Sequence, residues 1–161
     1  MGAWGNCDFH ELQEFQRKID SISEQQTQKF CEDCAKELAA RLLAKAIKRT
    51  PVGVYDQGSG KTGGTLRRGW TAQGNASGGR TASAKQYANS LKVTKSGSNY
   101  VVEITNPVEY ASYVEFGHRT RDHKGWVNGK FMMTISEKEV DAQAPGILQR
   151  KLIKYLKGVF S

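Results

Sequence analysis

The stretch Asn106–Phe131 reads NPVEYASYVEFGHRTRDHKGWVNGKF and predicts a short helix followed by a basic loop. Residues 108–116 place apolar and aromatic side chains at helical spacing, and Gly117 is a typical residue to end such a helix. Residues 117–130 are basic, contain a tryptophan and lack apolar periodicity. A loop of this length between ordered elements is more often functional than a bare connector. We therefore expect a docking loop here, and we expect the aromatic stripe of the helix to pack on a sheet.

Upstream of this stretch, the sequence predicts one long helix over residues 8–49. Asp8 and Glu11 form a variant capping box, and apolar residues then recur at helical spacing. A polar patch that begins at Ser23 is compatible with a bend. Thr50-Pro51 ends the helix, because proline has no N–H to donate and favours an extended residue before it.

The remaining segments predict a loop, a hairpin and C-terminal helices. Residues 53–80 are rich in Gly, Ser, Thr and Gln and predict a flexible basic loop. Alternating residues over 87–105 predict a β-hairpin, and helical spacing over 131–158 is interrupted at Pro145-Gly146. Together these segments predict a single α+β domain over 1–161, in which a long N-terminal helix packs on a small antiparallel β-sheet, with a short aromatic helix and C-terminal helices.

The positive charge is concentrated in the middle of the chain. The formal net charge is +8, and residues 48–102 contain nine Lys or Arg against one acid, Asp56. A basic middle between near-neutral flanks predicts an anionic partner, either the DNA backbone or an acidic protein surface. Four basic residues lie among small, flexible neighbours and are candidates for this contact: Lys61, Arg67, Arg68 and Arg80. The sequence contains no motif for base-specific recognition.

Motifs for catalysis are incomplete. Gly58–Thr62 ends like a phosphate-binding P-loop, but Tyr55 stands where that pattern needs its first glycine. His118 and His123 flank basic residues without the paired acids of a magnesium-dependent nuclease. We therefore expect a protein that is not an enzyme and that needs no cofactor.

Metal and membrane signals are weak as well. Cys31 and Cys34 lie three residues apart, but no second pair of zinc ligands accompanies them, so we expect reduced cysteines that pack as small apolar groups. No run approaches the roughly 18 apolar residues of a membrane span, and the first residues lack the features of a secretory signal. We expect no metal site and no membrane partner.

The order of several short motifs resembles a family of tail-completion, or head-to-tail joining, proteins of long-tailed bacteriophages (siphophages). The motifs are Thr50-Pro51-Val52, Leu66-Arg67-Arg68-Gly69-Trp70, Asn106–Thr120 and Phe131-Met132. The resemblance covers most of the chain from about Lys36 onward, and the sequence also carries an N-terminal addition. The Gly-rich insert 53–65 departs from the pattern of the family.

This resemblance implies a structural virion protein of the phage neck, synthesised in the cytoplasm of the host bacterium and without catalytic activity. Members of the family are expected as a hexameric ring around the DNA path, in contact with the tail tube or tail terminator protein and with the head–tail connector. In such a ring the four basic residues named above would face the lumen and the packaged DNA. The candidates for contact with a neighbouring ring are Tyr113, Phe116, His118, Arg119, Arg121 and Trp126. A tail terminator and a nonspecific DNA-binding protein are the alternatives.

Overall fold

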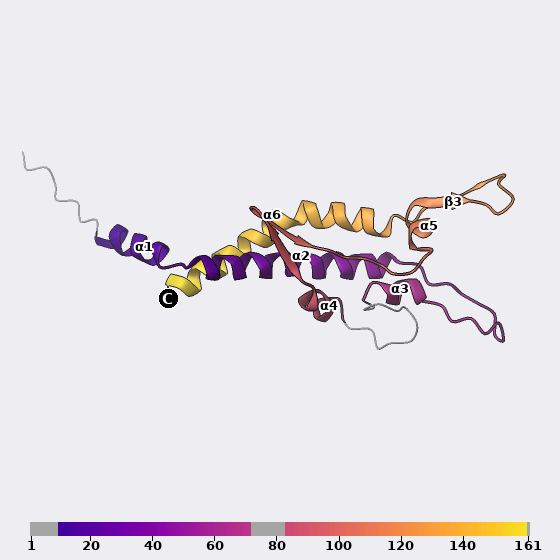
Figure 1. Cartoon of the computed structure of the whole chain (residues 1–161), viewed down its shortest axis with the longest axis horizontal. Coiled ribbons are helices and arrows are strands. Elements are labelled where there is room, and N and C mark those ends of the chain that lie inside the picture. Colours follow the sequence, from indigo (N-terminus) through magenta and orange to yellow (C-terminus); the bar gives the residue numbers. More distant parts are fainter. Residues whose placement is uncertain (1–9, 72–82, 161) are drawn as a thin grey trace, which may run out of the picture.

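The computed structural model describes residues 10–71 and 83–160. Two long helices, α2 (Glu24–Arg49) and α6 (Met132–Phe160), pack on each other and form the body of an elongated molecule (Figure 1). The remaining elements lie along this pair or extend from its two ends.

The long N-terminal helix is divided in two. A separate helix, α1 (His10–Asp20), precedes α2, and Ser23 caps the start of α2. The Ser23 hydroxyl accepts a hydrogen bond from the Gln26 N–H at 3.2 Å, and the Gln26 side chain accepts one from the Ser23 N–H at 3.0 Å. The prediction of one helix over 8–49 was wrong here, because this capping box starts a new helix at the polar patch. The cap expected at Asp8 lies outside the described residues.

Two short helices occupy segments that were expected to be loop and strand. Helix α3 (Thr65–Gly69) lies within the predicted flexible loop, and Leu66 is buried there. Helix α4 (Ala84–Ser90) takes the first part of the predicted hairpin, because Ser83 and Gln86 form a second capping box. The buried Tyr87 therefore belongs to a helix that packs on α2 and not to a strand.

The strands form two separate antiparallel hairpins. β1 (Val93–Ser96) pairs with β2 (Asn99–Val102), and both strands contact α2. β3 (Gly117–Arg119) pairs with β4 (Trp126–Asn128) inside the segment predicted as a loop. The predicted α+β class, with a long helix packed on a small antiparallel sheet, is confirmed.

α6 runs without a break through Pro145, so the prediction of two C-terminal helices was wrong. A proline inside a helix removes one backbone hydrogen bond. Contacts with α2 hold α6 on both sides of Pro145. Before the proline, Lys45 Nζ lies 2.7 Å from the Glu139 carboxylate, and after it Lys151 Nζ donates to the Asp33 carbonyl at 2.6 Å. Tertiary packing therefore maintains a helix that the local sequence would interrupt.

The core lies where α2, α3, α4 and α6 meet. Its buried apolar side chains are Ala39, Leu43, Ala46, Leu66, Trp70, Tyr87, Ala88, Val108 and Met132. The aromatic side chains near the short helix α5 (Ala111–Phe116) do not join it. Tyr113 and Phe116 are 59% and 62% exposed, so the prediction that the aromatic stripe packs on a sheet was wrong.

Candidate interface at the loop-bearing end

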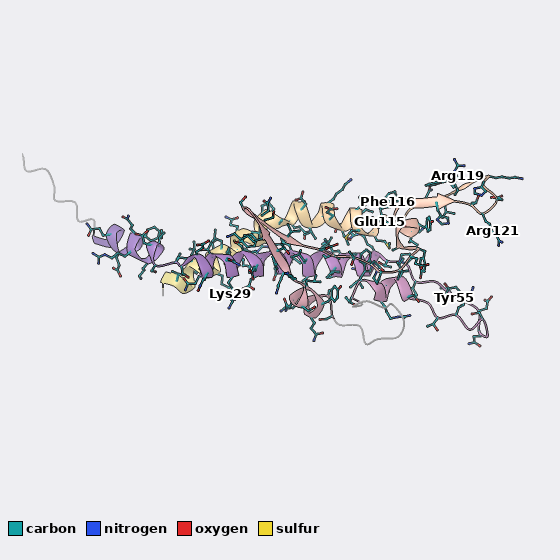
Figure 2. All side chains as sticks on the ribbon, in the orientation of Figure 1. Lys29, Tyr55, Glu115, Phe116, Arg119 and Arg121 are labelled. Atoms are coloured by element: carbon teal, nitrogen blue, oxygen red, sulfur yellow. The ribbon has the colours of Figure 1, made fainter. Side chains whose placement is uncertain are left out.

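Two segments project from the same end of the molecule, opposite the C-terminus (Figure 1). One is the loop 51–64, which leaves the end of α2, and the other is the β3–β4 hairpin. Tyr55 lies on the first, and Arg119 and Arg121 lie on the second (Figure 2). We call the surface made by the loop 51–64, α5 and residues 117–131 the distal end.

Thr50 anchors the base of the loop 51–64. Its fully buried hydroxyl donates to the Ala46 carbonyl at 2.7 Å and accepts a hydrogen bond from the Trp70 indole N–H at 2.6 Å. Arg67 donates from Nη2 and Nε to the Thr50 carbonyl at 2.7 and 3.1 Å. The two motifs around Thr50 and Arg67 thus form one hydrogen-bonded unit that fixes both ends of the loop.

Asn106 joins this unit to the segment that leads into α5. Its amide Nδ2 donates to the Leu66 carbonyl at 2.9 Å, and its Oδ1 accepts from the Val108 N–H at 3.2 Å. Gly69 packs so closely on Asn106 that a Cβ atom at that position would overlap the amide. The side chain therefore holds α3 against the chain that enters α5.

Glu115 fixes α5 to the start of α6. Its buried carboxylate accepts hydrogen bonds from the N–H groups of Met133 at 3.0 Å and Thr134 at 2.9 Å, and from the Thr134 hydroxyl at 2.8 Å. A carboxylate in this position satisfies N–H groups that have no partner within the helix and complements the helix dipole. The backbone N–H of Phe131 also donates to the Glu115 carbonyl at 3.0 Å, which closes the base of the hairpin.

Two glycines allow the strands of this hairpin to meet at its base. Gly117 has φ of +88°, and a Cβ there would lie 2.5 Å from the Val127 carbonyl oxygen. At Gly129 a Cβ would overlap the Glu115 carbonyl. Only residues without a side chain fit such an approach.

The hairpin tip is closed by a hydrogen-bonded turn. The Thr120 hydroxyl donates to the Asp122 carboxylate at 2.5 Å and accepts from the Gly125 N–H at 2.9 Å. This hydroxyl, and then the Lys124 N–H, lower the pKa of Asp122. The Asp122 carboxylate thus accepts hydrogen bonds within the turn. Arg119 and Arg121 are exposed, so the surface of the tip is basic.

The surface of the distal end carries two hollows with tyrosines in their lining. A hollow of about 320 Å³ lies between the loop 51–64 and α5, and Tyr55, Tyr110 and Val114 are among its lining residues. Tyr110 and Val114 also line a neighbouring hollow of about 460 Å³, together with Tyr113, His118 and Arg119. The two hollows thus share two lining residues and adjoin each other. The exposed apolar side chains of the distal end include Tyr55, Tyr110, Tyr113, Phe116, Trp126, Val127 and Phe131.

The six residues predicted to contact a neighbouring ring all lie on α5 or the hairpin, and therefore at the distal end. The rings of Tyr113 and His118 meet edge to face, with centroids 5.8 Å apart. Sequence reasoning missed Tyr55 and Tyr110, which line the hollows. Tyr110 lies four residues before Val114, and this helical spacing indicates that both side chains lie on one face. Tyr55 lies in a Gly-rich segment without apolar periodicity, so no sequence pattern indicates its position.

The four predicted basic residues are not equivalent. Lys61 lies on the projecting loop, with its ammonium 5.9 Å from the centre of the Tyr55 ring. Arg67 is held by the Thr50 carbonyl as described, and Arg68 donates to the Gly63 carbonyl at 3.1 Å. Arg80 lies outside the described residues. The structure thus gives both described arginines partners within the chain.

The described residues contain no group of three or more His, Cys, Asp or Glu side chains that could hold a metal ion. Cys31 and Cys34 are unpaired on α2, and burial raises the pKa of Cys34. Within the same described ranges, no helix has the length and apolar character needed to cross a membrane.

A family model described as "Bacteriophage HK97-gp10, putative tail-component" matches residues 13–117, which is more than half of the chain. The chain belongs to this HK97-gp10-like family. It is therefore a component related to the phage tail. No curated protein and no solved structure matches the sequence.

The matched segment of the HK97-gp10-like chain begins inside α1 and ends at Gly117. Most of α1 is thus part of the family pattern, which begins well before Lys36, where the resemblance was expected to start. The anchoring residues Thr50, Arg67 and Asn106 all fall within the match.

Proposed function

We propose that this HK97-gp10-like protein is a structural virion protein that completes the phage tail and joins it to the head at the neck. In this proposal it assembles as a hexameric ring around the DNA path, contacts the tail tube or terminator protein on one side and the head–tail connector on the other, and performs no catalysis. Membership of a phage tail family supports the general role. The distal end supports the joining role.

The observation that carries the proposal is a set of exposed aromatic side chains on a firmly hydrogen-bonded base. Phe116 and Trp126 are 62% and 59% exposed, whereas Glu115, the residue before Phe116, is buried and holds α5 on α6. Aromatic residues and arginine are enriched at the centres of protein interfaces. A surface that is ordered before binding loses less conformational entropy on association, so this end is suited to docking.

The charge of the distal end indicates the chemistry of its partner. Arg119 and Arg121 are exposed at the hairpin tip, where the Asp122 carboxylate is hydrogen-bonded to Thr120 within the turn. Complementary potentials guide association and favour the correct partner. We therefore propose that the hairpin docks on an acidic surface of the adjacent neck or tail component.

The loop 51–64 is the proposed DNA-facing element of the ring. Lys61 projects from it, and a lysine on a loop can follow phosphates without reading sequence. Arg67 and Arg68 contribute positive charge behind the loop, but their hydrogen bonds to backbone carbonyls give them a structural role as well. Contact with DNA would be secondary to contact with protein.

The test is electron microscopy of tails from a phage that lacks this gene, with purified protein added before the tails are mixed with filled heads. The proposal expects tails that form alone but join heads only after addition. Tails of irregular length without the protein would favour the tail terminator instead. Normal joining without the protein would refute the neck role, and salt-dependent DNA binding would then be measured next.

A further inference from the structure

A hollow between α2 and α6 carries a concentration of positive charge that the sequence did not indicate. It has a volume of about 330 Å³ and lies between the middle of α2 and the second half of α6. This half of α6 leads away from the distal end to the C-terminus (Figure 1), and residues 142–160 contain four bases and no acid. The net formal charge of the lining residues is +3. They are Glu37, Arg41, Ile147, Arg150, Lys151 and Lys154.

The acid of this hollow is paired within its own helix. The Glu37 carboxylate accepts a hydrogen bond from Arg41 Nε at 2.9 Å and lies 2.7 Å from Arg41 Nη2. Lys151 Nζ donates to a neutral group, the Asp33 carbonyl, at 2.6 Å. Within the part of the chain that the structure describes, the other two bases of α6 in the lining form no ion pair. The positive charge on the α6 side is therefore available to an anion from outside the chain.

The residue types of the hollow favour phosphates over a protein surface. Its described lining contains no aromatic side chain, whereas the distal end carries exposed aromatics. Protein interfaces are enriched in aromatic residues and depleted of lysine, while bases clustered along one helix are typical of nucleic-acid binding. Arg150 and Lys154 are exposed and four residues apart, so they lie on one side of α6, about 6 Å apart along its axis. Two such bases can contact successive phosphates of one strand.

We propose that Arg150 and Lys154 bind the phosphates of duplex DNA at this hollow without reading the base sequence. The contact is separate from the one proposed for the loop 51–64, which leaves the C-terminal end of α2. Contact at both places would align the α2–α6 pair along the DNA path. The inference rests on the proposed neck role only for the source of the DNA, because binding to free duplex requires no other phage component.

Fluorescence anisotropy of a short labelled DNA duplex, titrated with the full-length protein at several salt concentrations, tests this contact. Arg150→Gln combined with Lys154→Gln should weaken binding about tenfold at low salt. It should also lower the slope of log K against log salt by about 2, since each phosphate contact contributes about 0.9. The matched control, Lys85→Gln combined with Lys138→Gln, removes the same charge at exposed positions elsewhere and should change both values little. Arg150→Lys combined with Lys154→Arg preserves the charge and should bind like the unmodified protein.

Removal of the acid from the hollow supplies a measurement that a loss of folding cannot imitate. Glu37→Gln leaves the charge of Arg41 uncompensated and should tighten binding about threefold. Equal affinity and equal salt slope in the unmodified protein and in the α6 double variant would overturn the inference. So would a loss of binding in Lys61→Gln alone, because the loop 51–64 would then be the DNA contact.

The competing occupant is an acidic protein surface, because Ile153 is 47% exposed next to Lys154. Polyglutamate is the probe for it. Binding of polyglutamate that depends on the two α6 bases, without binding of duplex DNA, would overturn the inference in favour of a protein partner. None of these results decides whether the protein joins tails to heads, which the microscopy experiment tests independently.

Discussion

Glu115 Oε1 accepts two hydrogen bonds from Thr134, one from its backbone N–H at 2.9 Å and one from its hydroxyl at 2.8 Å. The acid of the Tyr-Val-Glu-Phe-Gly motif is therefore the cap of α6 and not a surface charge. Glu115 is buried, whereas the neighbouring Phe116 is 62% exposed. One short motif thus supplies both the anchor of the distal end and part of its exposed surface.

Glu115→Ala is expected to lower the free energy of unfolding by about 2–3 kcal/mol, because it removes a cap and leaves N–H groups at the start of α6 without their acceptor. Urea unfolding followed by circular dichroism measures the change. Glu109→Ala removes an exposed acid nearby and should cost far less. Equal losses in the two variants would contradict the capping role.

The hydrogen bond between Trp70 and Thr50 is testable by a double-mutant cycle. Thr50→Val and Trp70→Phe should each destabilise the protein by about 1–3 kcal/mol, since both groups are buried. The double variant should be more stable than the sum of the single losses predicts, by about 1 kcal/mol, because the bond can be lost only once. Additive losses in urea unfolding would show that the two groups act separately.

Two glycines should respond in opposite directions to alanine. Gly117→Ala is expected to cost about 1–3 kcal/mol, because φ is +88° and the new Cβ would meet the Val127 carbonyl. Gly146→Ala lies within α6, where the nearest atom to a new Cβ is 3.6 Å away, and should stabilise by about 0.5–1 kcal/mol. Thermal unfolding of both variants measures this, and a stabilised Gly117→Ala would exclude the close strand approach.

Stability should depend on pH through Glu139. The hydrogen bond from Lys45, and then the charge of Arg49, lower the pKa of Glu139. Because the folded pKa lies below the unfolded one, this contribution is fully present above the ordinary glutamate range and is lost as pH falls through the folded value. Between about pH 5 and about pH 3 the melting temperature of Glu139→Gln should fall less than that of the unmodified protein. Glu137→Gln, at an exposed position on the same helix, should follow the unmodified protein.

Exposed aromatics at the distal end should affect joining more than folding. Phe116→Ala and Trp126→Ala are expected to shift the free energy of unfolding by less than about 1 kcal/mol each, since most of each side chain already contacts water. Both should reduce the yield of joined particles in the tail–head assay. Lys29→Ala, at an exposed site on α2 toward the other end (Figure 2), should join normally. Normal joining by stable Phe116→Ala and Trp126→Ala would refute the interface role.

The sequence predicted the class of fold because its periodic segments are long. The apolar stripe that ends at Pro51 and the alternating residues of β2 needed no tertiary information. The errors fall where local and tertiary preferences compete. Pro145 predicts a break, but packing on α2 carries α6 through it. Ser23 and Ser83 start helices through capping boxes, which apolar periodicity alone does not reveal.

The sequence indicated which segment carries the candidate interface residues, but not the contacts that each residue makes within the fold. The exposed members of the docking loop were found from its composition, and they lie together at the distal end. The arginines of the Leu66–Trp70 motif were assigned to a partner, although Arg67 binds the Thr50 carbonyl, which lies 17 residues away in sequence. A contact of this kind depends on the tertiary fold, and neither spacing nor composition indicates it.

α2 has 26 residues and runs from the connection with α1 to Thr50, so it spans about 39 Å at the usual rise of 1.5 Å per residue. It acts as a spacer that keeps a fixed distance between the distal end and the opposite end of the molecule (Figure 1). Changing that distance would require insertions in α2 and α6 that keep both helices in phase, since the two are packed side by side. The thickness of any layer built from this protein is thus encoded in the length of a helix pair.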